Sequence, residues 1–259
     1  MHVPFAIRES ATVICALWAL FYMLRYLLKD GPHDLRKAVI AFLCFAGSIV
    51  TFWIVKQEGQ LIGIRYDLYI YRMDQFLHLG EGGAWMGQIL LSHVWGVWAL
   101  NLFYGLLPAA VMWLLIVYEP RPDYREVVYA ILLNLALAPL FYAAIPVSGP
   151  AFAFPGFPVL PHTVTPHIIH LHVPPNSIPS VHFSTALLIC WYLRRWSFPF
   201  AVAGAFLLLT GIATLASGQH YPFDLIVAIP YSASAVRAAK RLAHSAEVPA
   251  CAGAAPDLV

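Results

Sequence analysis

Two short segments in the C-terminal part of the chain carry residues whose types and spacing could perform catalysis. The first is PSVH at residues 179–182, and the second is HYPFD at residues 220–224. Histidine can act as a nucleophile or as an acid near neutral pH, and a carboxylate can orient an imidazole ring. Two histidines and a carboxylate are therefore sufficient for the covalent and proton-transfer steps of phosphoryl transfer.

Both segments lie where an apolar span meets a loop, and residues 183–217 between them are long enough for one helical hairpin. A hairpin returns the chain to the membrane face that it left, so we expect His182, His220 and Asp224 to meet. Pro222 suits the first turn of a helix, and an i to i+4 spacing puts His220 and Asp224 on one face. The carboxylate could then accept from one ring nitrogen of His220 and leave the other free to attack phosphorus.

The residues beside these three could hold a phosphate group. Ser180 is a favourable N-cap residue, and the free amides of a helix N-terminus bind anions. His182 would lie in that first turn, where it could protonate a leaving alkoxide. Ser217 and Gly218 could offer a hydroxyl and an amide to phosphate oxygens. We therefore predict His220, His182 and Asp224 as catalytic residues and these other three as substrate contacts.

The composition indicates a membrane protein. Hydrophobic residues make up 61% of the 259 positions and charged residues only 11%, whereas soluble proteins carry about 25% charged residues. The stretch from Val127 to Leu193 contains no Asp, Glu, Lys or Arg. The net charge of +2 is too small to suggest nucleic acid as a partner. The expected partners are the bilayer and a membrane lipid substrate.

Apolar runs of about 20 residues cross a bilayer as helices, and they predict an all-α polytopic bundle of about seven spans. The segment Ala84–Val97 is also apolar, but its tryptophans favour a helix at the membrane interface. The predicted spans are Ala11–Leu28, Ala38–Val55, Trp98–Tyr118, Val127–Val147, Val181–Trp196, Phe198–Ser217 and Phe223–Val236.

Basic residues orient this bundle. With seven spans, eleven of the fifteen Lys and Arg residues fall on the side of the C-terminus and four on the other side. The positive-inside rule then places the C-terminus in the cytoplasm. His182 and His220 would face the non-cytoplasmic side of a plasma, inner or endomembrane.

The connecting segments complete one membrane domain over residues 1–243. The polar and aromatic pattern of residues 57–83 predicts an amphipathic cap on the outer face of the membrane. Arg65 and Arg72 of this cap could neutralise a phosphate. The segment Ser148–Ser180 is long, uncharged and rich in proline, which is typical of a functional loop. Residues 244–259 are small and polar, and we expect a disordered cytoplasmic tail.

The two motifs, one hairpin apart, resemble the type-2 phosphatidic acid phosphatase superfamily, whose members are multi-span bundles that cleave lipid phosphates through a phosphohistidine. The resemblance covers a six-helix core at about residues 98–236. It implies His220 as the nucleophile, Asp224 as its partner, His182 as the general acid and Ser180 as a phosphate contact. It also implies an enzyme that needs neither a metal nor an organic cofactor.

The chain departs from the superfamily pattern in its basic residues. The region of the first motif, PVSGPAF at residues 146–152, has no cation, and Thr214 stands where an arginine would precede His220. In this respect the chain resembles the branch of fungal inositol phosphorylceramide synthases and their bacterial relatives. A phosphodiester carries less negative charge than a terminal phosphate. The departure therefore favours a diester donor, or a cation supplied by Arg65 or Arg72.

These observations predict phosphoryl transfer from a membrane lipid, with hydrolysis of a lipid or polyprenyl phosphate ester as the first hypothesis. One alternative is a headgroup phosphotransferase of the inositol phosphorylceramide synthase type. A second is a catalytically inactive lipid-binding or transport protein of the same fold.

Two features have competing interpretations. His162, His167, His170 and His172 could bind zinc, but their loop is broken by prolines and lacks a carboxylate or thiolate, which favours a polar lining for a headgroup. Arg72 and Asp74 could contact substrate, although a solvated pair at the membrane interface explains them as well.

Overall fold

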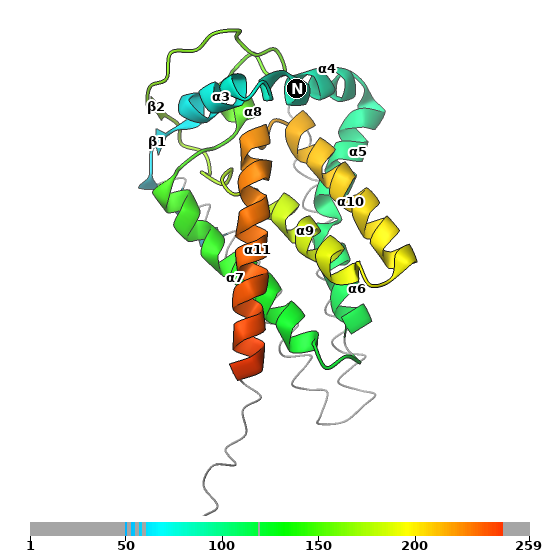
Figure 1. Ribbon diagram of the computed structural model, residues 1–259. Helices are drawn as coiled ribbons and strands as arrows, with labels where there is room; N and C mark the ends of the chain where they lie inside the picture. The colour runs from blue at the N-terminus through cyan, green and yellow to red at the C-terminus, as the bar shows by residue number, and fades with distance from the viewer. Residues whose placement is uncertain (1–49, 51–52, 55–56, 59–60, 119, 246–259) are drawn as a thin grey trace, which may run out of the picture.

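The computed structural model describes residue 50 and residues 53–54, 57–58, 61–118 and 120–245. The predicted span Ala11–Leu28, most of Ala38–Val55 and the tail beyond residue 245 lie outside these residues. In chain order the described elements are β1 (Ile64–Arg65), α3 (Asp67–Phe76), α4 (Gly80–Leu91), α5 (Val94–Gly105), α6 (Leu107–Tyr118), α7 (Tyr124–Ala144), α8 (Pro150–Ala153), β2 (Ile169–His170), α9 (Val181–Leu193), α10 (Ser197–Ala216) and α11 (Pro222–Ser245) (Figure 1).

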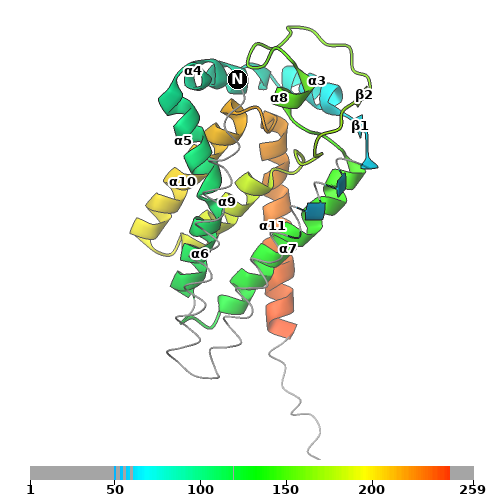
Figure 2. The ribbon, with the colours of Figure 1, turned by 180° about the vertical axis from the view of Figure 1, so that it is seen from behind.

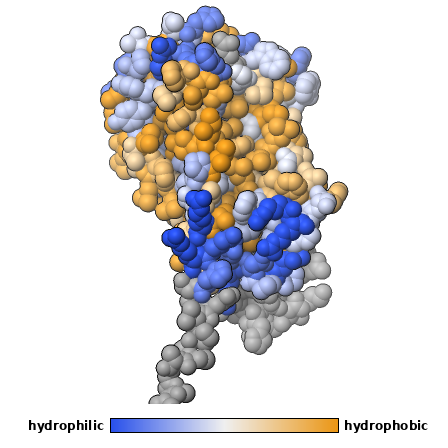
Figure 3. Space-filling model, viewed as in Figure 1, coloured by the Kyte–Doolittle hydropathy of each residue, from blue (hydrophilic) through white to orange (hydrophobic). Residues whose placement is uncertain are grey.

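The long helices form a bundle suited to a membrane. Among the described residues, three helical segments are long and apolar enough to cross a bilayer: Val94–Tyr118, Tyr124–Ala144 and Ser197–Ala216. The apolar helix α9 has 13 residues, which corresponds to about 20 Å. On the face drawn in Figure 3, an apolar band lies between two hydrophilic ends. Because such a surface needs lipid as its solvent, the predicted all-α membrane bundle is confirmed.

The segment predicted to lie at the interface is divided between two elements. Helix α4 ends at Leu91, and α5 starts at Val94 after a short turn. Residues 94–97 therefore belong to the first described span, which begins four residues before the predicted Trp98. Helices α3 and α4 lie across one end of the bundle, beside the N-terminus of α11 (Figures 1 and 2).

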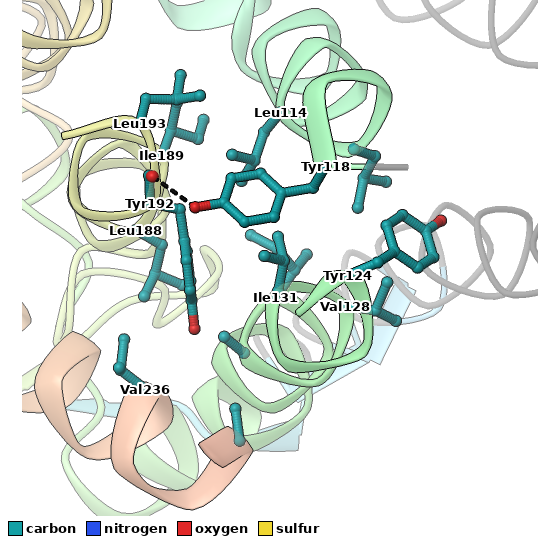
Figure 4. Packing of buried hydrophobic residues seen from close by; sticks show 14 of the residues in the cluster. Leu114, Tyr118, Tyr124, Val128, Ile131, Leu188, Ile189, Tyr192, Leu193 and Val236 are labelled. Carbon is teal, nitrogen blue, oxygen red and sulfur yellow. Dashed lines mark hydrogen bonds between the residues drawn. The ribbon is translucent and has the colours of Figure 1, made fainter. Parts of the chain in front are cut away.

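The largest buried cluster joins α6, α7, α9 and α11. Its members include Leu114, Ile131, Ile189 and Val236 (Figure 4). Polar links cross the same interfaces: the hydroxyl of Tyr118 donates to the carbonyl of Tyr192 at 2.6 Å, and the Asn134 amide donates to Thr185 Oγ1 at 2.9 Å. Interhelical hydrogen bonds of this kind are typical of helices packed within a membrane.

A cap covers the end of the bundle that carries the N-terminus of α11. Its two short strands pair antiparallel, with Ile64 opposite His170. A second buried cluster then packs α3 against the long loop and the α10–α11 turn, through Leu68, Tyr71, Phe154 and Tyr221. The predicted outer cap and the proline-rich loop are thus one packed unit, which lies directly over both candidate motifs.

Candidate active site

His220 lies in the turn between α10 and α11, and its side chain is only 2% exposed. The Nδ1 atom is 3.0 Å from the carbonyl oxygen of Ser177 and 3.5 Å from Oδ2 of Asp224. A carbonyl can only accept a hydrogen bond, so Nδ1 must carry the proton. In the neutral imidazole the other ring nitrogen, Nε2, then keeps its lone pair, which is the state that a nucleophile requires.

Asp224 is buried in the first turn of α11, where Pro222 is the first residue of the helix, as predicted. Its Oδ2 atom accepts from the backbone N–H of Tyr221 at 2.7 Å and from the hydroxyl of Ser177. The bond to Tyr221 resembles one half of a capping box. We expected the His220 ring to donate a hydrogen bond directly to this carboxylate. The ring instead donates to the carbonyl of Ser177, which is closer.

His182 lies in the first turn of α9. Ser180 is the N-cap of this helix, as predicted, and its side chain accepts from the backbone N–H of Phe183 at 3.4 Å. The partly buried ring of His182 stacks on Tyr104 of α5, with 3.8 Å between the ring centroids. An aromatic neighbour on one face limits the orientations that the imidazole can adopt.

Two loops touch backbone to backbone beside His220. Gly149 has φ of +105° and Gly218 has φ of +68°, conformations that side chains with a Cβ rarely adopt. A Cβ built on Gly149 would lie 2.4 Å from the carbonyl oxygen of Gln219. The N–H of Ala151 also donates to the Gly218 carbonyl at 2.9 Å. The region of the first motif therefore packs against the turn that precedes His220 and supports it.

Ser217 donates from its hydroxyl to the carbonyl of Thr214 at 3.2 Å. This hydroxyl is the group of Ser217 that the sequence suggested for phosphate binding. The backbone N–H of Gly218 donates to Leu215 at 3.1 Å. Contact of Ser217, Gly218 or Ser180 with a phosphate stays a prediction.

Arg65 and Arg72, the predicted cations, have different surroundings. Arg65 is fully buried, and its guanidinium donates to Ser148 Oγ and to the carbonyls of Ile62, Ile64 and Val173. These bonds hold the cap to the long loop. Arg72 is exposed on α3 and donates to the Gln75 side chain at 3.3 Å. Substrate contact by either arginine stays a prediction.

Two further carboxylates of α3 face the site. Asp67 accepts from the N–H groups of Ser148 and Gly149 and from the hydroxyl of Tyr221, at 2.8–3.1 Å. Asp74 accepts from the N–H of Phe223 at 2.9 Å. Both are fully buried, so the interpretation of Asp74 as part of a solvated pair with Arg72 was wrong. Sequence reasoning missed this role because acidic residues on a short cap helix normally face water.

Burial changes the protonation of these two carboxyls. It raises the pKa of Asp67 to about 6. It raises the pKa of Asp74 to about 8, and the nearby charge of Asp224 adds to this shift. Asp74 is therefore neutral at pH 7, and it does not place a second negative charge beside Asp224.

These values predict a pH-dependent stability. The unfolded chain loses the Asp74 proton near pH 4, whereas the folded chain keeps it until about pH 8. The folded state binds more protons in this window, so the free energy of unfolding must fall as the pH rises through it. We expect Asp74→Asn to flatten the fall of the melting temperature between pH 5 and about 8, by several degrees.

Asp67→Asn is the matched control, because the lower pKa of Asp67 confines its effect to pH values below about 6. Thermal unfolding of the three proteins in detergent at a series of pH values measures the difference. Parallel curves for wild type and Asp74→Asn between pH 6 and about 8 would show that Asp74 is already ionised at pH 6.

The histidines of the long loop are spread along it. His162 and His167 are exposed, and His167 Nδ1 contacts the carbonyl of Thr165 two residues away. His170 belongs to the β1–β2 pair. Within the described part of the chain, no group of three or more His, Cys, Asp or Glu side chains has a geometry that could hold a metal ion.

Comparison with protein families identifies the fold. A model of the PAP2 superfamily, the type-2 phosphatidic acid phosphatases, matches residues 68–237. The chain belongs to the PAP2 superfamily. No curated protein and no solved structure matches it.

Members of this superfamily are generally phosphatases or phosphotransferases. With three long apolar helical segments among its described residues, this PAP2 protein is an integral membrane protein. The match begins in α3 and ends in α11, and it includes both motifs, the long loop and Asp74 of the cap. Helix α4 and all of α3 except its first residue therefore belong to the family region, although the sequence placed the start of the core near Trp98.

Proposed function

We propose that this PAP2 protein hydrolyses a lipid or polyprenyl phosphate ester at the membrane surface, through a phosphohistidine on His220. The observation that carries the proposal is the hydrogen bond between Nδ1 of His220 and the Ser177 carbonyl, at 3.0 Å. This bond leaves the Nε2 lone pair available in a buried site, next to the carboxylate of Asp224.

The chemistry has two balanced steps. In the first, Nε2 of His220 forms a bond to phosphorus while the bond from phosphorus to the ester oxygen breaks, and His182 gives its proton to the leaving alkoxide. In the second, a water oxygen bonds to phosphorus while the phosphorus–nitrogen bond breaks, and a water proton returns to His182. Asp224 stabilises the positive charge that the phosphorylated ring of His220 carries.

Headgroup transfer is the second candidate, and the charges around the site favour it. The guanidinium of Arg65 is committed to the loop, and Arg72 is exposed. A singly charged phosphodiester needs less positive charge around it than the dianion of a monoester. In such an enzyme an alcohol oxygen, in place of water, would bond to phosphorus in the second step while the phosphorus–nitrogen bond breaks, as in an inositol phosphorylceramide synthase.

The active site of either enzyme would open on the non-cytoplasmic side. Eleven basic residues fall on the C-terminal side of the predicted spans and four on the opposite side. By the positive-inside rule, the side with eleven would be cytoplasmic, together with the C-terminus. A water-soluble, short-chain lipid phosphate added to intact cells should therefore yield product outside. Product that forms only after permeabilisation would place the site in the cytoplasm.

Products from reconstituted protein distinguish the candidates. The purified protein in liposomes would receive phosphatidic acid as a monoester or phosphatidylinositol as a diester, each labelled on phosphorus, with and without added inositol. We expect inorganic phosphate from phosphatidic acid at a rate that inositol does not change. Label that moves from the diester to another alcohol would replace hydrolysis by transfer. Neither product above protein-free liposomes would indicate the inactive lipid-binding or transport protein.

A further inference from the structure

Ser177 contacts both members of the His220–Asp224 pair, although it lies outside both motifs. Its carbonyl is 3.0 Å from Nδ1 of His220, and its hydroxyl donates to Oδ2 of Asp224. The same hydroxyl lies 3.3 Å from the carbonyl of Gln219. One buried residue of the long loop therefore reaches the nucleophile, its acidic partner and the residue before the nucleophile.

The position of Ser177 is itself well determined. Its backbone N–H donates to the carbonyl of Val147 at 2.9 Å, and the next residue after Val147 is Ser148, whose N–H donates to Asp67. Ser177 is fully buried, and the adjacent Ile178 is 3% exposed in the hydrophobic cluster of the cap. Close packing on these sides leaves the serine little freedom to move.

An acidic partner usually both orients the histidine ring and stabilises its positive charge. Here Ser177 and Asp224 each take one of these two roles. The 3.5 Å from Nδ1 to Oδ2 of Asp224 is too long for a good hydrogen bond, but it is short enough for charge stabilisation. The Ser177 carbonyl determines which ring nitrogen carries the proton. The Ser177 hydroxyl and the Tyr221 N–H both bind Oδ2 and hold the carboxylate beside the ring.

Other ionisable groups surround this arrangement. Asp67 and Asp74 face it from α3, Tyr142 from α7 and Tyr221 from the turn, and each interacts electrostatically with Asp224. Tyr221 and Asp67 hydrogen-bond to each other, and Asp74 accepts from Phe223. Ser177 differs from these groups because it contacts both members of the pair: its hydroxyl binds Asp224, and its carbonyl binds His220.

We propose that Ser177 is a positioning residue for phosphoryl transfer, acting through His220 and Asp224. The inference rests on the proposed function of that pair. Ser177 also lies three residues before Ser180, the N-cap of α9. A displacement of Ser177 would therefore disturb the helix start that carries His182 as well as the ring of His220.

A double-mutant cycle tests this role. Ser177→Ala keeps the carbonyl but removes the hydroxyl, and we expect kcat to fall by about 10- to 100-fold, as for loss of a hydrogen bond to a charged group. KM should change by less than about twofold, because the residue contacts the pair and not the lipid. In Asp224→Asn, the amide has no charge to position, so adding Ser177→Ala should lower kcat little further.

Ser232→Ala is the matched control, because Ser232 is a buried serine of α11 whose hydroxyl bonds to Ala228 and Ser184. It should retain the wild-type kcat, and melting temperatures would show that all variants are folded. Losses that multiply fully in the double variant, or a Ser177→Ala enzyme with wild-type kcat, would overturn the inference. Activity retained in His220→Ala would instead overturn the proposed function.

Discussion

Replacement of His220 by alanine is expected to lower kcat by more than about a thousandfold, the largest effect of any single substitution in this protein. The variant loses the Nε2 lone pair that the Ser177 carbonyl makes available. His182 and Asp224 remain, but they have no covalent intermediate to form or stabilise. Phosphate release or lipid product from reconstituted protein measures the loss.

The intermediate gives a second observable for the same variant. Wild-type enzyme quenched during turnover with phosphorus-labelled substrate should carry acid-labile label on His220, and His220→Ala should carry none. His244→Ala is the control, because this exposed histidine near the end of α11 bonds to the carbonyl of Lys240. Wild-type turnover in His220→Ala would exclude the phosphohistidine, and inhibition by EDTA that zinc reverses would favour the loop histidines.

Gly149→Ala should inactivate the enzyme almost as completely, without touching a reacting group. The backbone at Gly149 has φ of +105°, which costs a non-glycine residue about 1–3 kcal/mol. The new Cβ would also lie 2.4 Å from the Gln219 carbonyl oxygen. Because both partners are backbone, the loop must move away from the residue that precedes His220. Activity assays and thermal unfolding should both show the loss.

Gly204→Ala in α10 is the matched control for this substitution. A Cβ built there meets no atom within 4 Å, and alanine is favoured over glycine inside a helix by about 1 kcal/mol. This variant should therefore keep its activity and be as stable as wild type or slightly more so. Equal activity of the two variants would mean that the contact between Gly149 and Gln219 does not position His220.

The sequence by itself determined the features that depend on local patterns. Apolar run lengths predicted the three candidate spans among the described residues to within four residues, because the thickness of a bilayer dictates the length of a crossing helix. Helix α11 continues beyond the predicted end at Val236 to Ser245. Ser180 and Pro222 predicted the starts of α9 and α11, since helix ends follow from the hydrogen bonds of one turn. The spacing of the two motifs indicated the superfamily that the family comparison identified.

Only the tertiary structure decided which groups surround His220. Arg72 and Asp74 are two residues apart on α3, yet one is exposed and the other buried. Hydropathy cannot predict this, because the buried face of α3 includes the acids Asp67 and Asp74 beside Leu68 and Tyr71. Those acids are stabilised by backbone N–H groups of the long loop and of the first turn of α11, about 80 and 150 residues away.

Ser177 illustrates the same limit within the catalytic pair. A serine in a proline-rich loop has no local pattern that distinguishes it from its neighbours, and its partner His220 is 43 residues away. The Ser177 carbonyl lies against the imidazole in a loop that packs on α3 and on Gly218. The sequence therefore predicted which residues could react, whereas long-range packing chose the atom that holds the nucleophile in its reactive state.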